Sequence, residues 1–141
     1  MRTETQKNCL FLAWLIALVS TFGALFIGEI MERTPCVLCW YQRIAMFPLA
    51  LILGIAAFSS DTTVRRYVLP IAAIGAVVAL WHSLLFAGIV PETVQPCTRE
   101  GPSCTGDEQN LFGVLPLPFL SAAGFTAIIL LLTIPFRKSS T

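Results

Sequence analysis

The sequence contains little charge. Of its 141 residues, nine are Lys or Arg and eight are Asp or Glu, so that 12% are charged, about half the fraction found in an ordinary soluble domain. The formal net charge is +1 and there is no basic patch, which argues against nucleic-acid binding. The sequence also lacks a G-x-G-x-x-G dinucleotide motif, and Trp40 instead of histidine follows Cys39, which excludes a c-type haem site.

Charge is entirely absent from four long tracts, residues 8–28, 44–60, 67–91 and 109–136. A helix needs roughly 20 mainly apolar residues to cross the hydrocarbon core of a bilayer. Too little chain remains outside these tracts to build a soluble core. The sequence therefore predicts an all-α fold, a polytopic membrane protein with a bundle of four transmembrane helices.

Proline marks the ends of the expected spans, because it is tolerated in the first helical turn and cannot continue a helix. The third span is predicted to start at Pro70, and Pro48 is predicted to kink the second. We expect one integral membrane domain, residues 1–141, with spans at about 9–28, 36–58, 70–90 and 115–134. Small-residue contacts between helices are expected at Gly23, Gly54, Gly75 and Gly124.

Lys and Arg are distributed unequally between the two sides of the predicted bundle. The two termini and the 59–69 loop hold six of them, whereas the 29–43 and 91–114 segments hold three. Short loops rich in Lys and Arg stay in the cytoplasm. Both termini are therefore predicted to be cytoplasmic, and the loops at 29–35 and 91–114 are predicted to be extracytoplasmic.

Four of the five cysteines fall on the predicted outer side, as the pairs Cys36/Cys39 and Cys97/Cys104. Thiols outside the cytoplasm can be oxidised and stay oxidised. Two outward pairs therefore indicate disulfide chemistry. The remaining Cys9, at the cytoplasmic end of the first span, is interpreted as an apolar packing residue.

Cys36 and Cys39 form a C-x-x-C pair at the expected start of the second span, after Thr34-Pro35. The start of a helix favours the thiolate form of a cysteine. Arg43 shares a helix face with both cysteines and can stabilise a thiolate or a reduced oxygen-centred ligand. A bridge this short constrains little of the unfolded chain, so a redox-active pair is favoured over a structural disulfide. A zinc site built from all four outer cysteines is a further alternative.

Six residues lie between Cys97 and Cys104, and they include Gly101-Pro102, a turn that makes a bridge between the cysteines plausible. A disulfide in this polar segment would be accessible to the thiolate of another protein. The alternative is a structural disulfide that only stabilises the loop.

His82, the one histidine, lies deep in the third span. An ionisable residue inside a membrane suggests function, here proton handling at a redox site, with a hydrogen-bonded packing histidine as the alternative.

Residues 36–43 read CVLCWYQR at the start of the second of four spans, and this string resembles the disulfide bond formation protein B (DsbB) family. The similarity is greatest to its short Gram-positive branch, the BdbC-like thiol-disulfide oxidoreductases. It covers essentially the whole chain and includes Gly28-Glu29-Ile30, Pro48, the 66–70 segment and the paired cysteines before the fourth span.

The resemblance implies an enzyme of the bacterial cell membrane that supports disulfide bond formation in exported proteins. Such an enzyme reoxidises a soluble or tethered extracytoplasmic thiol oxidase of thioredoxin fold, DsbA-like or BdbD-like, and passes the electrons to a membrane quinone. The short branch favours menaquinone, with ubiquinone as the alternative.

The resemblance also implies roles for the cysteines. Cys97 and Cys104 would take electrons from the partner, with Cys97 joined to it in the mixed disulfide. Cys36 and Cys39 would reoxidise that pair, and Cys39 would lie against the quinone ring.

Two further residues match the family, since Arg43 corresponds to an arginine that supports quinone binding and His82 to a third-helix histidine of the short branch. The compact outer loop between the third and fourth spans departs from the longer branch.

Two alternatives to this function remain. Vitamin K epoxide reductases also place C-x-x-C in a four-helix bundle, but near the fourth span. A small membrane scaffold or metal-site protein with structural disulfides would carry the same cysteines.

Overall fold

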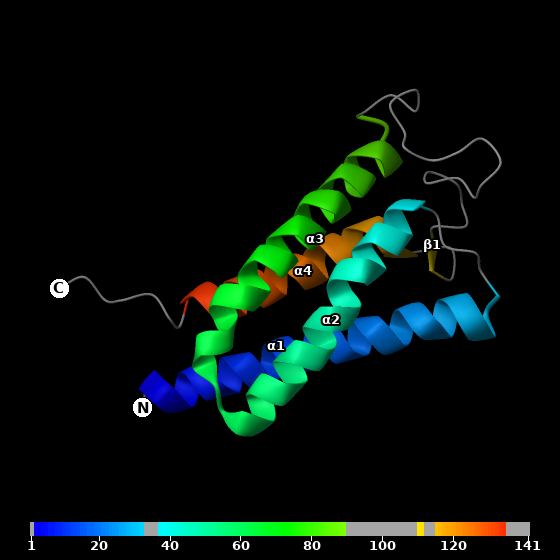
Figure 1. Cartoon of the computed structure of the whole chain (residues 1–141). Coiled ribbons are helices and arrows are strands. Elements are labelled where there is room, and N and C mark those ends of the chain that lie inside the picture. The colour runs from blue at the N-terminus through cyan, green and yellow to red at the C-terminus, as the bar shows by residue number, and fades with distance from the viewer. Residues whose placement is uncertain (1, 33–36, 90–109, 112–114, 135–141) are drawn as a thin grey trace.

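The computed structural model describes residues 2–32, 37–89, 110–111 and 115–134. Its elements are, in chain order, α1 (Arg2–Leu25), the π-helix η1 (Phe26–Ile30), α2 (Val37–Ser59), the 3-10 helix η2 (Thr62–Val64), α3 (Arg65–Phe86), β1 (Asn110–Leu111), β2 (Leu115–Pro116) and α4 (Leu117–Thr133). The two short strands pair antiparallel, and the four α-helices form a bundle (Figure 1). The predicted all-α fold is confirmed.

Three helical segments are long and apolar enough to cross a membrane, Glu4–Ile30, Val37–Ser59 and Thr62–Phe86. The fourth, Leu117–Thr133, is equally apolar but has 17 residues, about 26 Å at 1.5 Å per residue. Large apolar side chains such as Val19, Phe22 and Phe58 remain exposed on the outside of the bundle. Exposed apolar side chains of this kind are what hydrocarbon covers in a multi-pass membrane protein.

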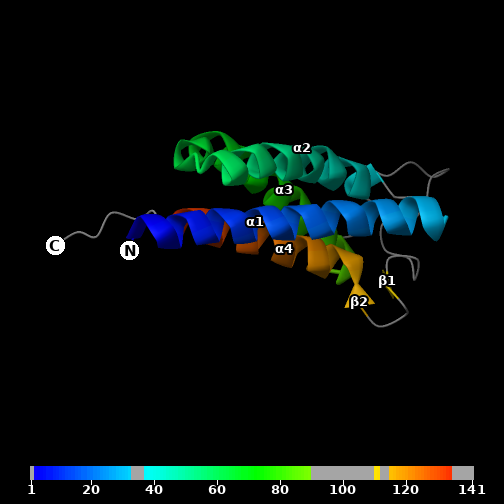
Figure 2. The ribbon, with the colours of Figure 1, turned by 90° about the horizontal axis from the view of Figure 1, so that it is seen from below.

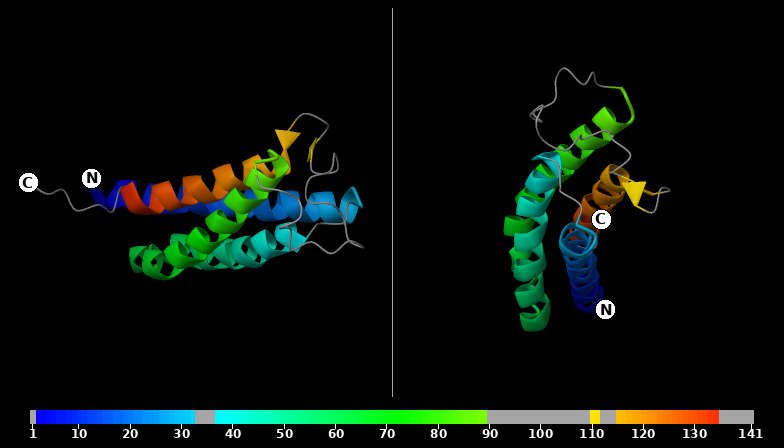
Figure 3. Two further views of the ribbon diagram at one scale, coloured as in Figure 1. Left: turned by 90° about the horizontal axis from the view of Figure 1, so that it is seen from above. Right: turned by 90° about the vertical axis from the view of Figure 1, so that its right-hand side faces the viewer.

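Each helix packs mainly against its neighbours in chain order, and α4 closes the ring against α1 (Figures 1 and 2). The start of α1, the turn between α2 and α3 and the end of α4 lie at one end of the bundle (Figure 3). The start of α2 and the end of α3 lie at the other. This arrangement places Cys39 and the last turns of α3 at the same end.

Several helix boundaries differ from the expected spans: the first helix already starts at Arg2, and the third ends at Phe86. The third helix starts at Arg65, not at Pro70, which lies inside α3. Because Pro70 is only the sixth residue of that helix, it removes a single backbone hydrogen bond near the end, where few such bonds exist. The first helix continues past Leu25 as a π-helix that ends at Ile30, and α2 runs through Pro48 without interruption.

The turn between α2 and α3 is held by Asp61. Its carboxylate Oδ1 accepts hydrogen bonds from the hydroxyl of Thr63 at 2.5 Å and from its backbone N–H at 3.0 Å. These two bonds stabilise the carboxylate and hold the pKa of Asp61 below its ordinary value, the hydroxyl contributing most. The preceding Ser60 has a positive φ of 57°, so that the chain reverses within a few residues.

Two glycines occupy the close helix contacts that were expected of them. A Cβ atom on Gly75 of α3 would lie 2.2 Å from Cε1 of Phe125, a fully buried side chain of α4. A Cβ atom on Gly54 of α2 would lie 2.7 Å from Nε1 of Trp14 on α1. At both positions the absence of a side chain lets an aromatic ring of a neighbouring helix pack against the backbone.

The other two glycines are not required for a close approach of helices. A Cβ atom on Gly124 would make only an ordinary contact, 3.7 Å from Oγ of Ser20. A Cβ atom on Gly23 would have no neighbour within 4 Å in the part of the chain that the structure describes. Gly23 is therefore not a close helix contact there.

We predict that Gly75→Ala destabilises the bundle, because its methyl group would overlap the Phe125 ring. Overpacking of this kind costs about 1–3 kcal/mol, which would lower the midpoint of thermal unfolding in detergent. The matched control is Gly23→Ala, which should leave stability equal or slightly higher because alanine favours helices. Adding Phe125→Leu to Gly75→Ala should restore part of the loss. Equal unfolding midpoints for the two alanine variants would contradict the packing described above.

Candidate functional site at the interface of α2 and α3

The first turn of α2 packs against the last turns of α3. Leu38 of α2 and Leu85 of α3 are buried together, and Cys39 and Val78 pack against them. The Cys39 side chain is half-buried at this contact. The expected redox cysteine therefore lies at a helix interface, where the bundle covers it in part.

One turn further along the same interface, a buried hydrogen bond joins the two helices. Nε2 of Gln42 lies 2.9 Å from Nδ1 of His82. Gln42 is 7% exposed and His82 is 1% exposed. Because Cys39 and Gln42 are three residues apart on α2, the bond places the imidazole next to the helical turn that carries the thiol.

The neighbouring residue, Ser83, holds the same turn of α3 against α4. The Ser83 hydroxyl shares its hydrogen between the carbonyls of Ala79, at 2.8 Å, and Pro118 of α4, at 3.1 Å. Ser83 is buried, and its bond to Pro118 ties α3 to the start of α4. The α3 turn that carries the histidine is therefore fixed against both neighbouring helices.

Arg43 points from α2 toward α1. Its Nη2 donates a hydrogen bond of 2.7 Å to the carbonyl of Ala24, next to the start of the π-helix. A Cβ atom on Gly28 would lie only 3.0 Å from the same nitrogen, so the guanidinium rests against the bare backbone of that glycine. Its Cζ atom also lies 5.6 Å from the centre of the Trp40 ring, within cation–π range.

The guanidinium retains capacity for a ligand. In the part of the chain that the structure describes, the bond to Ala24 is the one hydrogen bond of Arg43, whereas a guanidinium has five N–H donors. Trp40 and Tyr41 are about half exposed, as expected of aromatic side chains at the boundary of a bilayer. Arg43 is therefore a partly buried cation near that boundary with donors to spare.

Three of the six predicted site residues, Cys39, Arg43 and His82, thus come from neighbouring turns at one end of the bundle. The other three, Cys36, Cys97 and Cys104, lie outside the described residues. Within the described ranges, no group of three or more His, Cys, Asp or Glu side chains can hold a metal ion. The four-cysteine zinc hypothesis depends on the residues outside those ranges.

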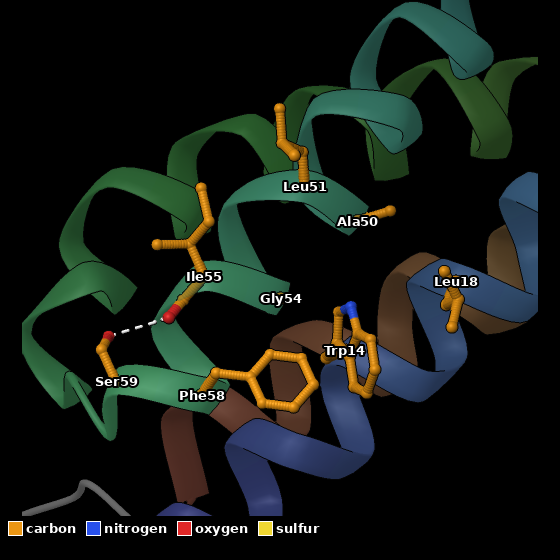
Figure 4. Close-up of a pocket in the computed structure, with 8 residues that line it drawn as sticks. All are labelled: Trp14, Leu18, Ala50, Leu51, Gly54, Ile55, Phe58 and Ser59. Atoms are coloured by element: carbon orange, nitrogen blue, oxygen red, sulfur yellow. Dashed lines mark hydrogen bonds between the residues drawn. The ribbon is translucent and has the colours of Figure 1, made fainter.

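An apolar groove lies elsewhere, between α1 and the second half of α2 (Figure 4). Its volume is about 690 Å³, and Trp14, Leu18, Gly54 and Phe58 are among the side chains that line it. Among the described residues, its lining contains no thiol, acid or imidazole. The groove is therefore separate from Cys39, Arg43 and His82.

Comparison with known proteins identifies the family. The family model described as "Disulfide bond formation protein DsbB" matches residues 6–134. The chain belongs to the DsbB family. It is a multi-pass membrane protein of disulfide bond formation, and the resemblance carried by CVLCWYQR is confirmed.

This chain and its relatives in the DsbB family align over nearly the whole length of both proteins. A "Probable disulfide formation protein" of Metapseudomonas resinovorans is 55% identical over 94% of this chain and 92% of its own. "Disulfide bond formation protein C" of Bacillus subtilis is 45% identical over 86% and 87%, and a "Probable disulfide formation protein" of Deinococcus radiodurans is 43% identical over 92% and 89%. No solved structure matches the chain.

Sequence reasoning missed Gln42 in this DsbB-family site. The sequence did contain a sign of the role of Gln42. Its polar amide lies three residues after Cys39, on the same face of a mainly apolar helix. A buried amide requires a hydrogen-bond partner. The sequence does not indicate which side chain of which helix supplies that partner.

Ser83→Ala should lower the free energy of unfolding by about 1 kcal/mol, because it removes a buried hydrogen bond between α3 and α4. Ser59→Ala is the matched control, since the Ser59 hydroxyl donates to Ile55 at 2.8 Å and to Ala56 at 3.4 Å, both within α2. Thermal unfolding in detergent measures both variants. If Ser59→Ala were as destabilising as Ser83→Ala, the bond to Pro118 would contribute nothing.

Proposed function

We propose that this protein is a membrane thiol-disulfide oxidoreductase. It reoxidises an extracytoplasmic thiol oxidase of thioredoxin fold and passes the electrons through two cysteine pairs to a membrane quinone. The observation that carries the proposal is the convergence at one end of the bundle. There, a half-buried thiol lies one helical turn from the glutamine that is hydrogen-bonded to a buried imidazole, and one turn from a guanidinium with donors to spare.

These residues fit a quinone. A quinone has an apolar ring and two carbonyl oxygens, so it needs apolar surroundings and hydrogen-bond donors. Leu38, Val78 and Leu85 supply the apolar surroundings of Cys39. Arg43 supplies donors on the side of α1, and His82 supplies an imidazole on the side of α3. A bound quinone would accept two electrons and two protons.

The cysteines supply those electrons by thiol exchange. A thiolate of the reduced partner attacks the Cys97–Cys104 disulfide at Cys97, and the mixed disulfide resolves to leave the partner oxidised. Cys97 and Cys104, now thiols, reduce the Cys36–Cys39 disulfide in the same way. Oxidation of Cys36 and Cys39 back to a disulfide releases the two electrons and two protons that the quinone takes up.

The route requires both cysteine pairs on the extracytoplasmic side, with both termini in the cytoplasm. The distribution of Lys and Arg supports this orientation. The similarity to "Disulfide bond formation protein C" of Bacillus subtilis supports a short-branch partner of the DsbA or BdbD type and favours menaquinone over ubiquinone. The bacterial cell membrane is the location that this chemistry requires.

The electron route predicts which thiols are essential. Purified protein is supplied anaerobically with a reduced dithiol donor of thioredoxin fold and a short-chain quinone, and quinone absorbance is followed. Wild type should reduce the quinone, and Cys36→Ser or Cys39→Ser should abolish the reduction. Cys97→Ser should block exchange with the donor while the Cys36–Cys39 disulfide stays intact.

Cys9→Ser is the matched control, since Cys9 lies near the start of α1, at the other end of the bundle. Its turnover should equal that of wild type. Turnover by Cys39→Ser at the wild-type rate would overturn the proposal. No turnover by any form, with the donor shown active elsewhere, would favour structural disulfides or a zinc site, and bound zinc would be measured next.

Arg43→Leu should raise the KM for quinone by roughly 10- to 100-fold, because hydrogen bonds to a charged group contribute about 1.5–3 kcal/mol. Arg66→Leu is the matched control. Arg66 also stacks on a neighbouring aromatic ring, 5.1 Å from the centre of Tyr67, but at the other end of the bundle. Steady-state kinetics at varied quinone concentration separate KM from kcat. An unchanged KM in Arg43→Leu would remove Arg43 from the quinone site.

A further inference from the structure

The apolar groove between α1 and α2 lies toward the end of the bundle where α1 begins, since Ser59, the last residue of α2, belongs to its lining (Figure 4). Two of its lining residues, Ala50 and Gly54, are buried. Leu51 and Ile55 are about two-thirds exposed on the outside of the bundle. The groove therefore opens toward the lipid that surrounds a membrane protein.

A hydrogen-bond donor lies in this groove. The indole of Trp14 packs against two aromatic rings, whose centres are 5.3 Å away for Phe11 and 5.2 Å away for Phe58. Its Nε1 lies beside the bare backbone of Gly54, because a Cβ atom there would be 2.7 Å from it. Among the described residues, no oxygen accepts a hydrogen bond from this N–H. An unpaired donor in apolar surroundings is costly, so the site favours a ligand that brings an acceptor oxygen.

A cation lies on the same face of α1 as this donor. Lys7 is seven residues before Trp14, so it lies two helical turns, about 10 Å, closer to the end of the bundle. Its Nζ pairs with Glu4 at 3.8 Å, but the two side chains are 41% and 73% exposed. An exposed pair of this kind is weak. The ammonium therefore remains able to bind a second anion at the boundary of the membrane.

We propose that the groove binds a phospholipid with an anionic head group, from the leaflet on the side where α1 begins. The head group contacts Lys7, an ester carbonyl accepts the hydrogen bond of Trp14, and an acyl chain lies over Ala50 and Gly54. These three groups follow one another in the lipid in the same order. A free fatty acid lacks the separate acceptor oxygen, and a quinone lacks the anion.

This lipid site is independent of the proposed electron route. The distribution of Lys and Arg predicts that the leaflet concerned is the cytoplasmic one, whereas Cys39 lies at the other end of the bundle. Tryptophan is also enriched at the boundary of a bilayer, where ester carbonyls lie. Loss of the lipid therefore leaves the redox cysteines in place, and a failure of one proposal does not decide the other.

The test measures the lipid that the protein retains. Wild type is reconstituted in nanodiscs with equal amounts of phosphatidylglycerol and phosphatidylcholine, and native mass spectrometry identifies the lipids that stay bound. We expect retention of phosphatidylglycerol in clear excess over phosphatidylcholine. Equal retention of the two lipids, or retention of neither, would overturn the proposal.

Two substitutions separate the donor from the cation. Trp14→Phe keeps the aromatic packing but removes the N–H, so retention of phosphatidylglycerol should fall roughly two- to tenfold, the effect of one hydrogen bond. Lys7→Gln should lower the preference for phosphatidylglycerol about fivefold, the effect of one cation near an anionic lipid. Trp81→Phe and Arg66→Gln, both on α3 and outside the groove, are the matched controls and should match wild type. Wild-type retention in both Trp14→Phe and Lys7→Gln would show that the lipid binds elsewhere.

Thermal unfolding in detergent gives a second readout, because a ligand that binds only the folded protein raises the unfolding midpoint. Added phosphatidylglycerol should raise the midpoint less in Trp14→Phe than in Trp81→Phe. Each variant is compared with its own midpoint without lipid, so that a loss of stability from the substitution itself does not enter. Displacement of phosphatidylglycerol by a long-chain quinone would assign the groove to that ligand and would count against the lipid.

Discussion

The structure depends on the absence of water in the hydrocarbon core of a bilayer. A polar group there must find its partner within the protein, because no solvent can supply one. The backbone meets this requirement by forming helices. The few polar side chains of the interior meet it by bonding between helices, and each such bond fixes how two helices are placed. Gln42 with His82, and Ser83 with the Pro118 carbonyl, are two buried examples among the described residues.

Helix α2 carries polar side chains that form hydrogen bonds to two neighbouring helices. From one turn of α2, Gln42 reaches α3 and Arg43 reaches the carbonyl of Ala24 on α1. Cys39 lies three and four residues before them on the same helix. The residues that hold α2 between its neighbours are therefore those that surround the thiol. Stability and the proposed chemistry use the same side chains, so a substitution at this turn alters both.

Most of the fold was predictable because membrane helices must be long and apolar. The four charge-free tracts indicated the four helices, and C-x-x-C followed by Trp-Tyr-Gln-Arg indicated the family. The boundary at Pro70 was predicted wrongly, because a proline near the start of a helix removes one hydrogen bond at little cost, so α3 begins at Arg65. Gly23 was misread because a glycine in an apolar helix does not show which face it occupies.

The sequence by itself determined the class of the protein and its family, and it predicted Cys39, Arg43 and His82 as site residues, which the structure places at one end of the bundle. Hydropathy and residue spacing are properties of the linear sequence, so they can be determined from the sequence directly. Only the tertiary structure decided the ring order of the helices, the partner of Gln42 and the direction in which Arg43 points. These depend on contacts between residues far apart in the sequence, 40 positions apart in the case of Gln42 and His82. Such contacts are chosen by the packing of side chains such as Phe125 against Gly75, which no local pattern encodes.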